Sequence, residues 1–264
     1  MLTVPEFQHR KKRREKLSMI TCYDASFASI LAESPIDILL VGDSSSMVMQ
    51  GEDSTIHATP ESIAFFTRSV AKGARGQKFI VADMPFLSNR TGIEAGVRAA
   101  GDLLRAGAHA VKIEGIRGNE ALVSHLVESG IPVMGHLGLT PQFVNAFGGM
   151  KVQAKTAEEQ ERLLQDAKTF ERCGAFALVL ECIPSSIAAR LTGALSIPTI
   201  GIGAGREVDG QVLVLQDMLG FNPGFKPRFL RTYLDGKGLF LDAFRSFHED
   251  VTLLEFPTEQ ESYL

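Results

Sequence analysis

The 264-residue sequence has no tryptophan, only three tyrosines and three cysteines, and no apolar run of the roughly 20 residues that cross a membrane. The cysteines, Cys22, Cys173 and Cys182, form no CxxC pair, which argues against a disulfide framework. The N-terminal residues MLTVPEFQHRKKRREK lack an apolar segment after their basic run, so no secretory signal is predicted. These features favour a cytoplasmic protein that does not insert into membranes.

The net charge of −4 provides no general attraction to nucleic acid or to an anionic membrane surface. One local exception is the basic run HRKKRREK at residues 9–16. This run could grip phosphate groups, or it could be the solvated face of an N-terminal helix at about residues 5–16. We favour the helix face, because the run has no interleaved aromatic residues and lies in an acidic chain. We therefore expect no nucleic-acid partner.

Short apolar runs rich in β-branched residues alternate with helical patterns along the chain. The runs occupy residues 18–21, 38–41, 79–82, 110–113, 132–137, 177–180, 198–202 and 211–215. Eight strands that alternate with helices predict an α/β fold, a single (β/α)8 TIM barrel. An open doubly wound sheet is the alternative, because short buried strands look the same in both folds. The barrel prediction is weakest between the last two runs, where little helical sequence is present.

Helix signals support this alternation. Thr59 followed by Pro60 predicts a helix start, and Thr156 with Glu159 forms a capping-box pattern. An apolar stripe predicts a C-terminal helix at about residues 238–256, followed by an acidic tail. No linker divides the chain, so we expect residues 1–264 to form one barrel domain.

Polar residues follow the predicted strands, at the barrel end where chemistry takes place in this architecture. Alone, each would usually be a helix cap or a satisfied polar group. Their recurrence over several strands instead predicts an active site at the mouth of the barrel. The residues are Asp24, Asp43, Ser44, Asp83, Lys112, Glu114, His136 and Glu181.

Several carboxylates gathered in one place repel each other unless a positive charge lies among them. A divalent cation would supply it, and oxygen ligands without a CxxC or HxxxH pattern favour Mg²⁺ over zinc. Magnesium usually retains water ligands, so its open positions could accept a bidentate anion such as a 2-oxo acid.

Three of these residues also have simpler interpretations. Lys112 and Glu114 point the same way on a strand, so the lysine could hold a substrate carboxylate or could only neutralise a buried acid. Glu181 could transfer protons or could cap the helix that starts near Pro184. His136 could orient a substrate or could form an ordinary buried hydrogen bond. The glycine-rich GIGAG at 201–205 matches neither the dinucleotide fingerprint nor a P-loop.

Several motifs, in order and over about residues 3–250, resemble the ketopantoate hydroxymethyltransferase family of the phosphoenolpyruvate/pyruvate barrel superfamily. They are LSMITCYDASFASILAE, VGDSSSMVMQGEDST, ADMPF, VKIEG, GHLGLTPQFVNAFGG, LVLECIP, IPTIGIGAG and DGQVLVLQDMLG. The resemblance implies transfer of a hydroxymethyl group from 5,10-methylenetetrahydrofolate to 3-methyl-2-oxobutanoate, the first committed step of pantothenate biosynthesis. It also implies a homodecamer, a pentamer of dimers.

By the same resemblance, Asp43, Asp83 and Glu114 are the expected Mg²⁺ site, with Glu114 binding directly or through water. Asp43, Ser44, Asp83 and Lys112 are the expected substrate contacts, Glu181 is the expected proton acceptor, and His136 is a further candidate.

This sequence departs from the family at VGDSSSM, where Ser45 and Ser46 replace a leucine and a glycine. We expect this change to alter the loop beside the metal rather than the activity. Two rival functions stay open at this point. One is a C–C lyase or phosphonomutase of the same superfamily, and the other is a scaffold or nucleic-acid binder that uses residues 9–16.

Overall fold

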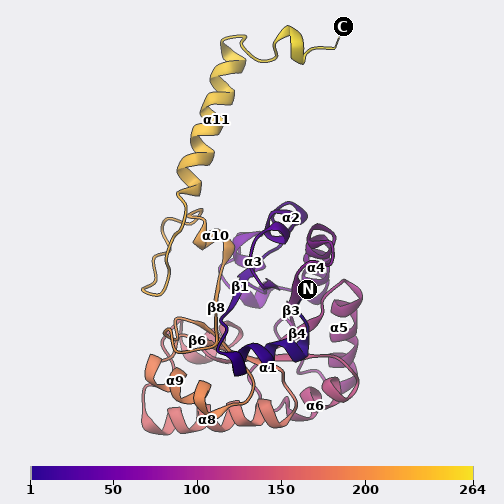
Figure 1. The fold of residues 1–264 in the computed structure, drawn as a ribbon, viewed down its shortest axis with the longest axis vertical. Helices are drawn as coiled ribbons and strands as arrows, with labels where there is room; N and C mark the ends of the chain where they lie inside the picture. Colours follow the sequence, from indigo (N-terminus) through magenta and orange to yellow (C-terminus); the bar gives the residue numbers. More distant parts are fainter. Residues whose placement is uncertain (1, 264) are drawn as a thin grey trace. The chain divides into compact units, whose positions relative to one another are not determined.

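The computed structural model describes residues 2–263 and contains a closed barrel of eight parallel strands in sequence order, with β8 paired to β1 (Figure 1). The closed barrel confirms the predicted fold, and the open sheet is wrong. The strands are β1 (Leu17–Thr21), β2 (Ile38–Val41), β3 (Phe79–Asp83), β4 (Ala110–Glu114), β5 (Val133–Gly138), β6 (Ala177–Glu181), β7 (Thr199–Ile202) and β8 (Gly210–Leu213).

Helices follow most of the strands, and each predicted cap lies where the sequence indicated. Thr59 begins α4 and Thr156 begins α8, each with a reciprocal capping box. No helix lies between β7 and β8, the connection where the alternation was predicted to be weakest. The helices of this part are α1 (Val4–Arg13), α2 (Ala25–Glu33), α3 (Ser45–Val48), α4 (Pro60–Ala74), α5 (Ile93–Arg105), α6 (Glu120–Glu128), α7 (Val144–Phe147), α8 (Ala157–Arg172) and α9 (Ser185–Ala194), with 3-10 turns η1 (Thr55–His57) and η2 (Pro141–Phe143).

Helix α1 lies across the end of the barrel where the strands begin (Figure 1). Its Phe7 is fully buried, and the Phe7 ring packs edge-on against Phe79 at 5.1 Å and Phe176 at 4.9 Å between ring centroids. Burial of one such side chain contributes about 1.5 to 3 kcal/mol. The bottom of the barrel is therefore sealed, and the opposite end is left for chemistry.

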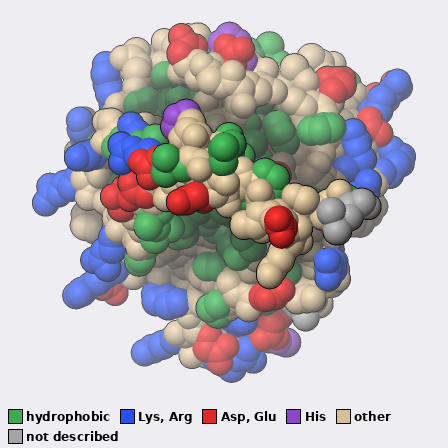
Figure 2. Space-filling model, turned by 90° about the horizontal axis from the view of Figure 1, so that it is seen from above, with side chains coloured by type: hydrophobic (Ala, Val, Ile, Leu, Met, Phe, Trp, Pro, Cys, Tyr) green, Lys and Arg blue, Asp and Glu red, His purple; other side chains and the backbone are tan. Residues whose placement is uncertain are grey.

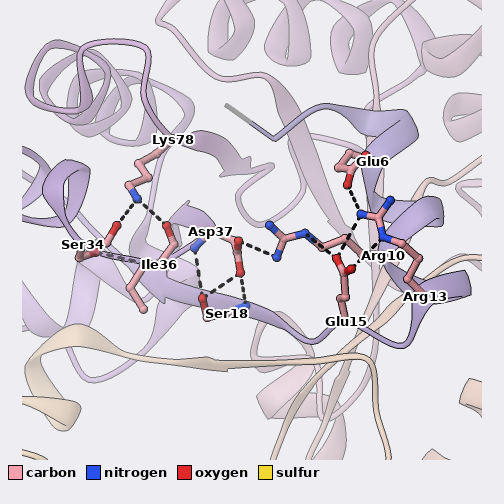
Figure 3. Close-up of polar contacts among 9 residues, drawn as sticks. All are labelled: Glu6, Arg10, Arg13, Glu15, Ser18, Ser34, Ile36, Asp37 and Lys78. Carbon is pink, nitrogen blue, oxygen red and sulfur yellow. Dashed lines mark hydrogen bonds and ion pairs between the residues drawn. The ribbon is translucent and has the colours of Figure 1, made fainter.

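The basic run at residues 9–16 is held by ion pairs with the barrel (Figure 3). Arg10 points at Asp37, with Nη1 2.8 Å from Oδ1, and Arg13 lies between Glu6 and Glu15. These pairs support the interpretation of the run as a helix face, because Arg10 and Arg13 already have acidic partners. Helix α1 ends at Arg13, since Arg14 adopts a left-handed conformation with φ of 57°.

The chain forms two compact units: the first ends at Val214, and the second begins at Leu215. The second unit contains α10 (Leu215–Met218), α11 (Gly236–Thr252) and η3 (Glu259–Glu261). Helix α11 begins at Gly236 because the Asp235 side chain accepts a hydrogen bond from the backbone N–H of Gly238. The prediction of one domain over residues 1–264 stays a prediction. Among the described residues, no helix has the length and apolar character that spanning a membrane would require.

Candidate active site

Five of the predicted site residues form one buried cluster at the carboxyl ends of β2 to β5. None of these residues is more than 4% exposed. The strand register brings them together, since Asp83 is paired with Lys112 and Glu114 with His136 across neighbouring strands. The buried cluster contains Asp43, Asp83, Lys112, Glu114 and His136.

Lys112 lies at the centre of this cluster. Its Nζ is 3.2 Å from Asp83 Oδ1, 3.5 Å from Glu114 Oε1 and 3.1 Å from His136 Nδ1. Burial alone would lower the lysine pKa, but the surrounding carboxylates outweigh it and raise the pKa. Lys112 and Glu114 therefore point into the barrel together, as their two-residue spacing predicted.

His136 connects two carboxylates from different strands. Its Nδ1 is 3.1 Å from Glu114 Oε1, and its Nε2 is 3.2 Å from Glu181 Oε2. The second contact is an ion pair without well-aligned hydrogen-bond geometry. Burial and the nearby Lys112 lower the histidine pKa, but Glu114 and Glu181 raise it more, to about 9. The neighbouring carboxylates therefore favour the protonated form of His136, whose charge would help to hold the Glu114 pKa below its usual value despite burial.

Asp43 and Asp83 lie side by side at the ends of β2 and β3. The Asp43 backbone N–H donates to Asp83 Oδ2 at 2.9 Å. Burial raises the pKa of both side chains, and repulsion from Glu114 adds to this in each case. These two carboxyl groups are thus in an environment that favours an additional proton or another positive charge.

Gln142, to which the sequence analysis gave no role, joins the two halves of the cluster. Its Nε2 donates to Asp43 Oδ2 at 2.8 Å and to the Met84 carbonyl at 3.0 Å, and its backbone N–H donates to Glu114 Oε2 at 3.0 Å. Gln142 lies in the turn η2, which begins with Pro141 just after β5. Its position after a strand end could have marked Gln142 as a candidate. Sequence periodicity, however, does not predict which residue of a loop faces the cluster.

The first strand contributes Tyr23 rather than Asp24 to this region. Tyr23 Oη and Ser44 Oγ share a hydrogen bond of 2.8 Å, whereas Asp24 caps α2 by accepting from the Phe27 N–H. The prediction that Asp24 faces the mouth with the other acids was therefore wrong. The helix that starts at the next residue explains why: an aspartate in that position satisfies a free N–H of the first turn.

The unusual serines of VGDSSSM fit the loop without strain. Ser46 Oγ lies 2.9 Å from the carbonyl oxygens of both Asp43 and Ser54, so its hydroxyl ties the start of α3 to the loop that follows. Ser45 is buried, and its hydroxyl has no hydrogen-bond partner among the described residues. Asp43 lies in the buried cluster beside this loop, and the expected change of the loop relative to the family stays a prediction.

Glu181 ends β6 and does not cap the next helix. The N-cap of α9 is Pro184, and no side chain caps this helix. The Glu181 side chain is 18% exposed, in contrast to the buried cluster, and Cys182 after it has a left-handed φ of 45°. Glu181 thus lies between the buried His136 and the open end of the barrel, which is a suitable position for proton transfer.

The residues present suit a magnesium ion better than a metal with a dense protein cage. Among residues 2–263, no three His, Cys, Asp or Glu side chains lie in a preformed metal-binding arrangement. Magnesium needs only one or two carboxylates and retains water. Asp83 Oδ1 is buried with the Lys112 ammonium 3.2 Å away, and Asp43 lies beside it. Both Glu114 oxygens already accept hydrogen bonds, so Glu114 fits a contact through water.

Sequence comparisons identify relatives along the whole chain. Residues 1–259 match the family described as ketopantoate hydroxymethyltransferase. A 3-methyl-2-oxobutanoate hydroxymethyltransferase of Bdellovibrio bacteriovorus is 53% identical over 100% of both chains. An enzyme of the same name from Francisella tularensis subsp. novicida is 49% identical over 100% of this chain and 99% of its own.

Solved structures with the same fold are much more distant in sequence. A phosphonopyruvate hydrolase in complex with oxalate and Mg²⁺ has a TM-score of 0.67 at 9% identity and covers 98% of this chain and 93% of its own. A 2,3-dimethylmalate lyase of the PEP mutase/isocitrate lyase superfamily has a TM-score of 0.59 at 14% identity and covers 100% of this chain and 93% of its own. At these identities the similarity supports the barrel fold alone.

Proposed function

Because the chain belongs to the ketopantoate hydroxymethyltransferase family, we propose that it takes its one-carbon unit from 5,10-methylenetetrahydrofolate with the help of Mg²⁺. The chain is a transferase that forms ketopantoate from 3-methyl-2-oxobutanoate. The donor, the metal and the residue roles are the proposed part.

Asp43 and Asp83 would hold the Mg²⁺ ion, with Glu114 reaching it through water. When bound, the ion would act as a Lewis acid for the 2-oxo group of the substrate. The raised pKa values of Asp43 and Asp83 support this assignment, because a cation would compensate for their burial.

Lys112 and Ser44 are proposed to bind the substrate oxygens. Lys112 supplies the positive charge beside Asp83, and Ser44 lies next to Asp43 with its hydroxyl oriented by Tyr23. A substrate held by these groups would have its C3 hydrogen fixed relative to Glu181, and such positioning lowers the barrier to reaction.

Glu181 is proposed to remove the C3 proton, and the resulting carbanion equivalent would form a C–C bond to the methylene carbon of the donor. The bonds from this carbon to the folate nitrogens would break, water would supply the hydroxyl group of the product, and tetrahydrofolate would leave. The observation that carries this role is the contact of Glu181 with His136, which continues to Glu114 and Lys112. His136 Nε2, 3.2 Å from Glu181 Oε2, would hold this carboxylate in position for the proton transfer. His136 is thus a positioning residue for the base.

Exchange of the C3 hydrogen of 3-methyl-2-oxobutanoate in D₂O, followed by NMR, tests this proposal. The wild-type protein should catalyse exchange that depends on Mg²⁺. Glu181→Gln should lower the exchange rate by about 10²-fold or more, the usual contribution of a general base. Glu94→Gln, at a side chain that is 88% exposed, is the control and should not change the rate. Near-normal exchange by Glu181→Gln would remove Glu181 from this role.

The rival functions are less well supported. Lyases and mutases of this fold are distant neighbours, and lyase activity would appear as cleavage of an isocitrate-like acid without folate. For nucleic-acid binding, the basic run would need free charges, but Arg10 and Arg13 are paired with acids. On the face drawn in Figure 2, lysine and arginine side chains also lie among acidic ones.

We further propose a homodecamer, a pentamer of dimers, in the cytoplasm. Three apolar side chains of α11, Leu239, Phe244 and Phe247, are at least 56% exposed in the single chain, which is consistent with burial against another copy. All three cysteines are free, as expected in a reducing compartment. Light scattering coupled to size-exclusion chromatography tests the assembly, and a monomer at micromolar concentration would contradict it.

A further inference from the structure

A cavity of about 340 Å³ lies beside the buried cluster and is separate from it. It opens between the loops that follow β4 and β5 and the first turns of α8, and it includes Arg90 from the segment before α5. Its volume is at the lower end of the range for small-molecule sites, and its position is the barrel face where such sites occur. None of the proposed metal or substrate residues lines it.

The charges that line the cavity favour an anionic ligand. Its two acids are already bound: Asp166 accepts from Arg117 Nε at 2.9 Å, and Glu159 accepts the backbone N–H groups of Lys155 and Thr156. Among the residues that the structure describes, the hydrogen-bond partner of the Arg90 side chain is a backbone carbonyl, that of Arg117, at 2.7 Å. Arg162 also lines the cavity, from the exposed side of α8. Two guanidinium groups are thus available for a carboxylate.

The apolar part of the lining favours a flat ring. Phe143 and Phe147 have ring centroids 6.2 Å apart at 33°, and the Arg90 guanidinium lies 5.4 Å from the Phe143 centroid. Gly115 borders this part of the cavity with a left-handed φ of +71°, and a Cβ there would lie 3.6 Å from the Phe143 ring, an ordinary packing distance. Aromatic faces of this kind bind planar heterocycles by stacking.

The cavity shares its wall with the buried cluster. Gly115 directly follows Glu114, and Phe143 directly follows Gln142, whose side chain and backbone bind Asp43 and Glu114. Gly138, at the back of the cavity, packs against the carbonyl oxygen of Glu181. A ligand that reaches toward Gly138 from the cavity would therefore approach the backbone of Glu181 without occupying the position proposed for the substrate.

We propose that this cavity binds the one-carbon donor, a planar heterocycle that carries carboxylates, with its rings on Phe143 and Phe147 and its carboxylates at Arg90 and Arg162. This inference rests on the proposed function, because it assigns the donor a place within that reaction.

Calorimetric titration of the full chain with tetrahydrofolate tests the assignment; the chain has no tryptophan to report binding by fluorescence. Arg90→Met and Arg162→Met should each weaken binding by about tenfold or more, as expected for loss of a charged hydrogen bond. Arg98→Met, at an arginine 72% exposed on α5, is the matched control and should bind as wild type does. Each variant should retain folate-independent C3 exchange of 3-methyl-2-oxobutanoate within about twofold, since no cavity residue touches the substrate position in the buried cluster.

Unchanged tetrahydrofolate affinity in both arginine variants would overturn the cavity assignment and leave the proposed function standing. If the arginine variants lost both C3 exchange and tetrahydrofolate binding, the assignment would also be overturned, because the arginines would then be needed for the fold rather than for binding the donor. If the wild-type protein catalysed exchange but bound no tetrahydrofolate, the folate part of the proposed function would fail first, and this assignment with it.

Discussion

Replacement of Gly138 by alanine should damage the catalytic site through the backbone. Gly138 ends β5 with φ of +97°, a region that costs other residues about 1 to 2 kcal/mol. An added Cβ would lie 2.2 Å from the Glu181 carbonyl oxygen and 2.8 Å from Ile183 Cγ2, closer than nonbonded atoms can approach. Overpacking of this kind typically costs about 1 to 3 kcal/mol. We therefore expect Gly138→Ala to lose about 2 to 5 kcal/mol of unfolding free energy.

Gly130→Ala provides a matched control for the backbone term. Gly130 has a similar φ of +83°, but a Cβ added at this position would meet no atom within 4 Å. Its loss should be limited to about 1 to 2 kcal/mol, so the difference between the two variants measures the contact with Glu181. Urea unfolding monitored by circular dichroism gives both values.

Activity should separate the two variants even more clearly. The same Glu181 carbonyl accepts the Leu139 N–H at 2.8 Å, so a shift there moves the end of β6 and with it the proposed base. A displacement of about 1 Å can cost about 10²-fold in rate, and we expect a large loss of C3 exchange in Gly138→Ala but none in Gly130→Ala. Equal stability losses and equal rates would refute the argument that Gly138 fixes the position of Glu181.

The pKa of His136, raised to about 9 from its usual 6.5, should make stability depend on pH. Protonated His136 should contribute up to about 3 kcal/mol to the unfolding free energy; this contribution should be complete below pH 6.5 and lost as pH rises through about 9. Urea unfolding of the metal-free protein should show this fall in unfolding free energy with pH, and His136→Gln should reduce it. Magnesium at about 100 times its dissociation constant should raise the unfolding free energy of the wild-type protein by about 2.7 kcal/mol. If Asp83 binds the ion, adding magnesium to Asp83→Asn should leave the melting temperature of this variant unchanged. Thr156→Ala should remove the cap of α8 and cost about 1 kcal/mol, whereas Lys168→Ala, exposed on the same helix, should be nearly neutral in the same measurement.

The sequence was sufficient for the barrel because its signals are local. Each strand is a short apolar run, and the caps at Thr59 and Thr156 bind N–H groups three residues away. Such patterns depend on neighbouring residues, so they can be read without a partner from elsewhere in the chain. The same locality applies to Lys112 and Glu114, whose shared direction follows from strand geometry alone.

Contacts between loops could not be read in this way. Gln142 bonds to Asp43, which is 99 residues away, and nothing in either segment specifies that distance. Asp24 shows the opposite error: a local cap signal was present, but the strand-end pattern was given more weight. In this barrel, strand ends indicate where functional side chains can lie, and the following residues decide whether they are used for capping instead.

The electrostatics of the buried cluster divide it into two parts with different requirements. Glu114 lies against both Lys112 and His136, and its pKa is lowered, so this part is balanced by protein charges. Burial raises the pKa of both Asp43 and Asp83 despite the nearby Lys112 ammonium. A barrel that buries two aspartates with too little positive charge loses stability unless a cation or protons arrive. This division agrees with the proposed roles, in which Asp43 and Asp83 hold the metal ion and Glu181, beside His136, transfers the proton.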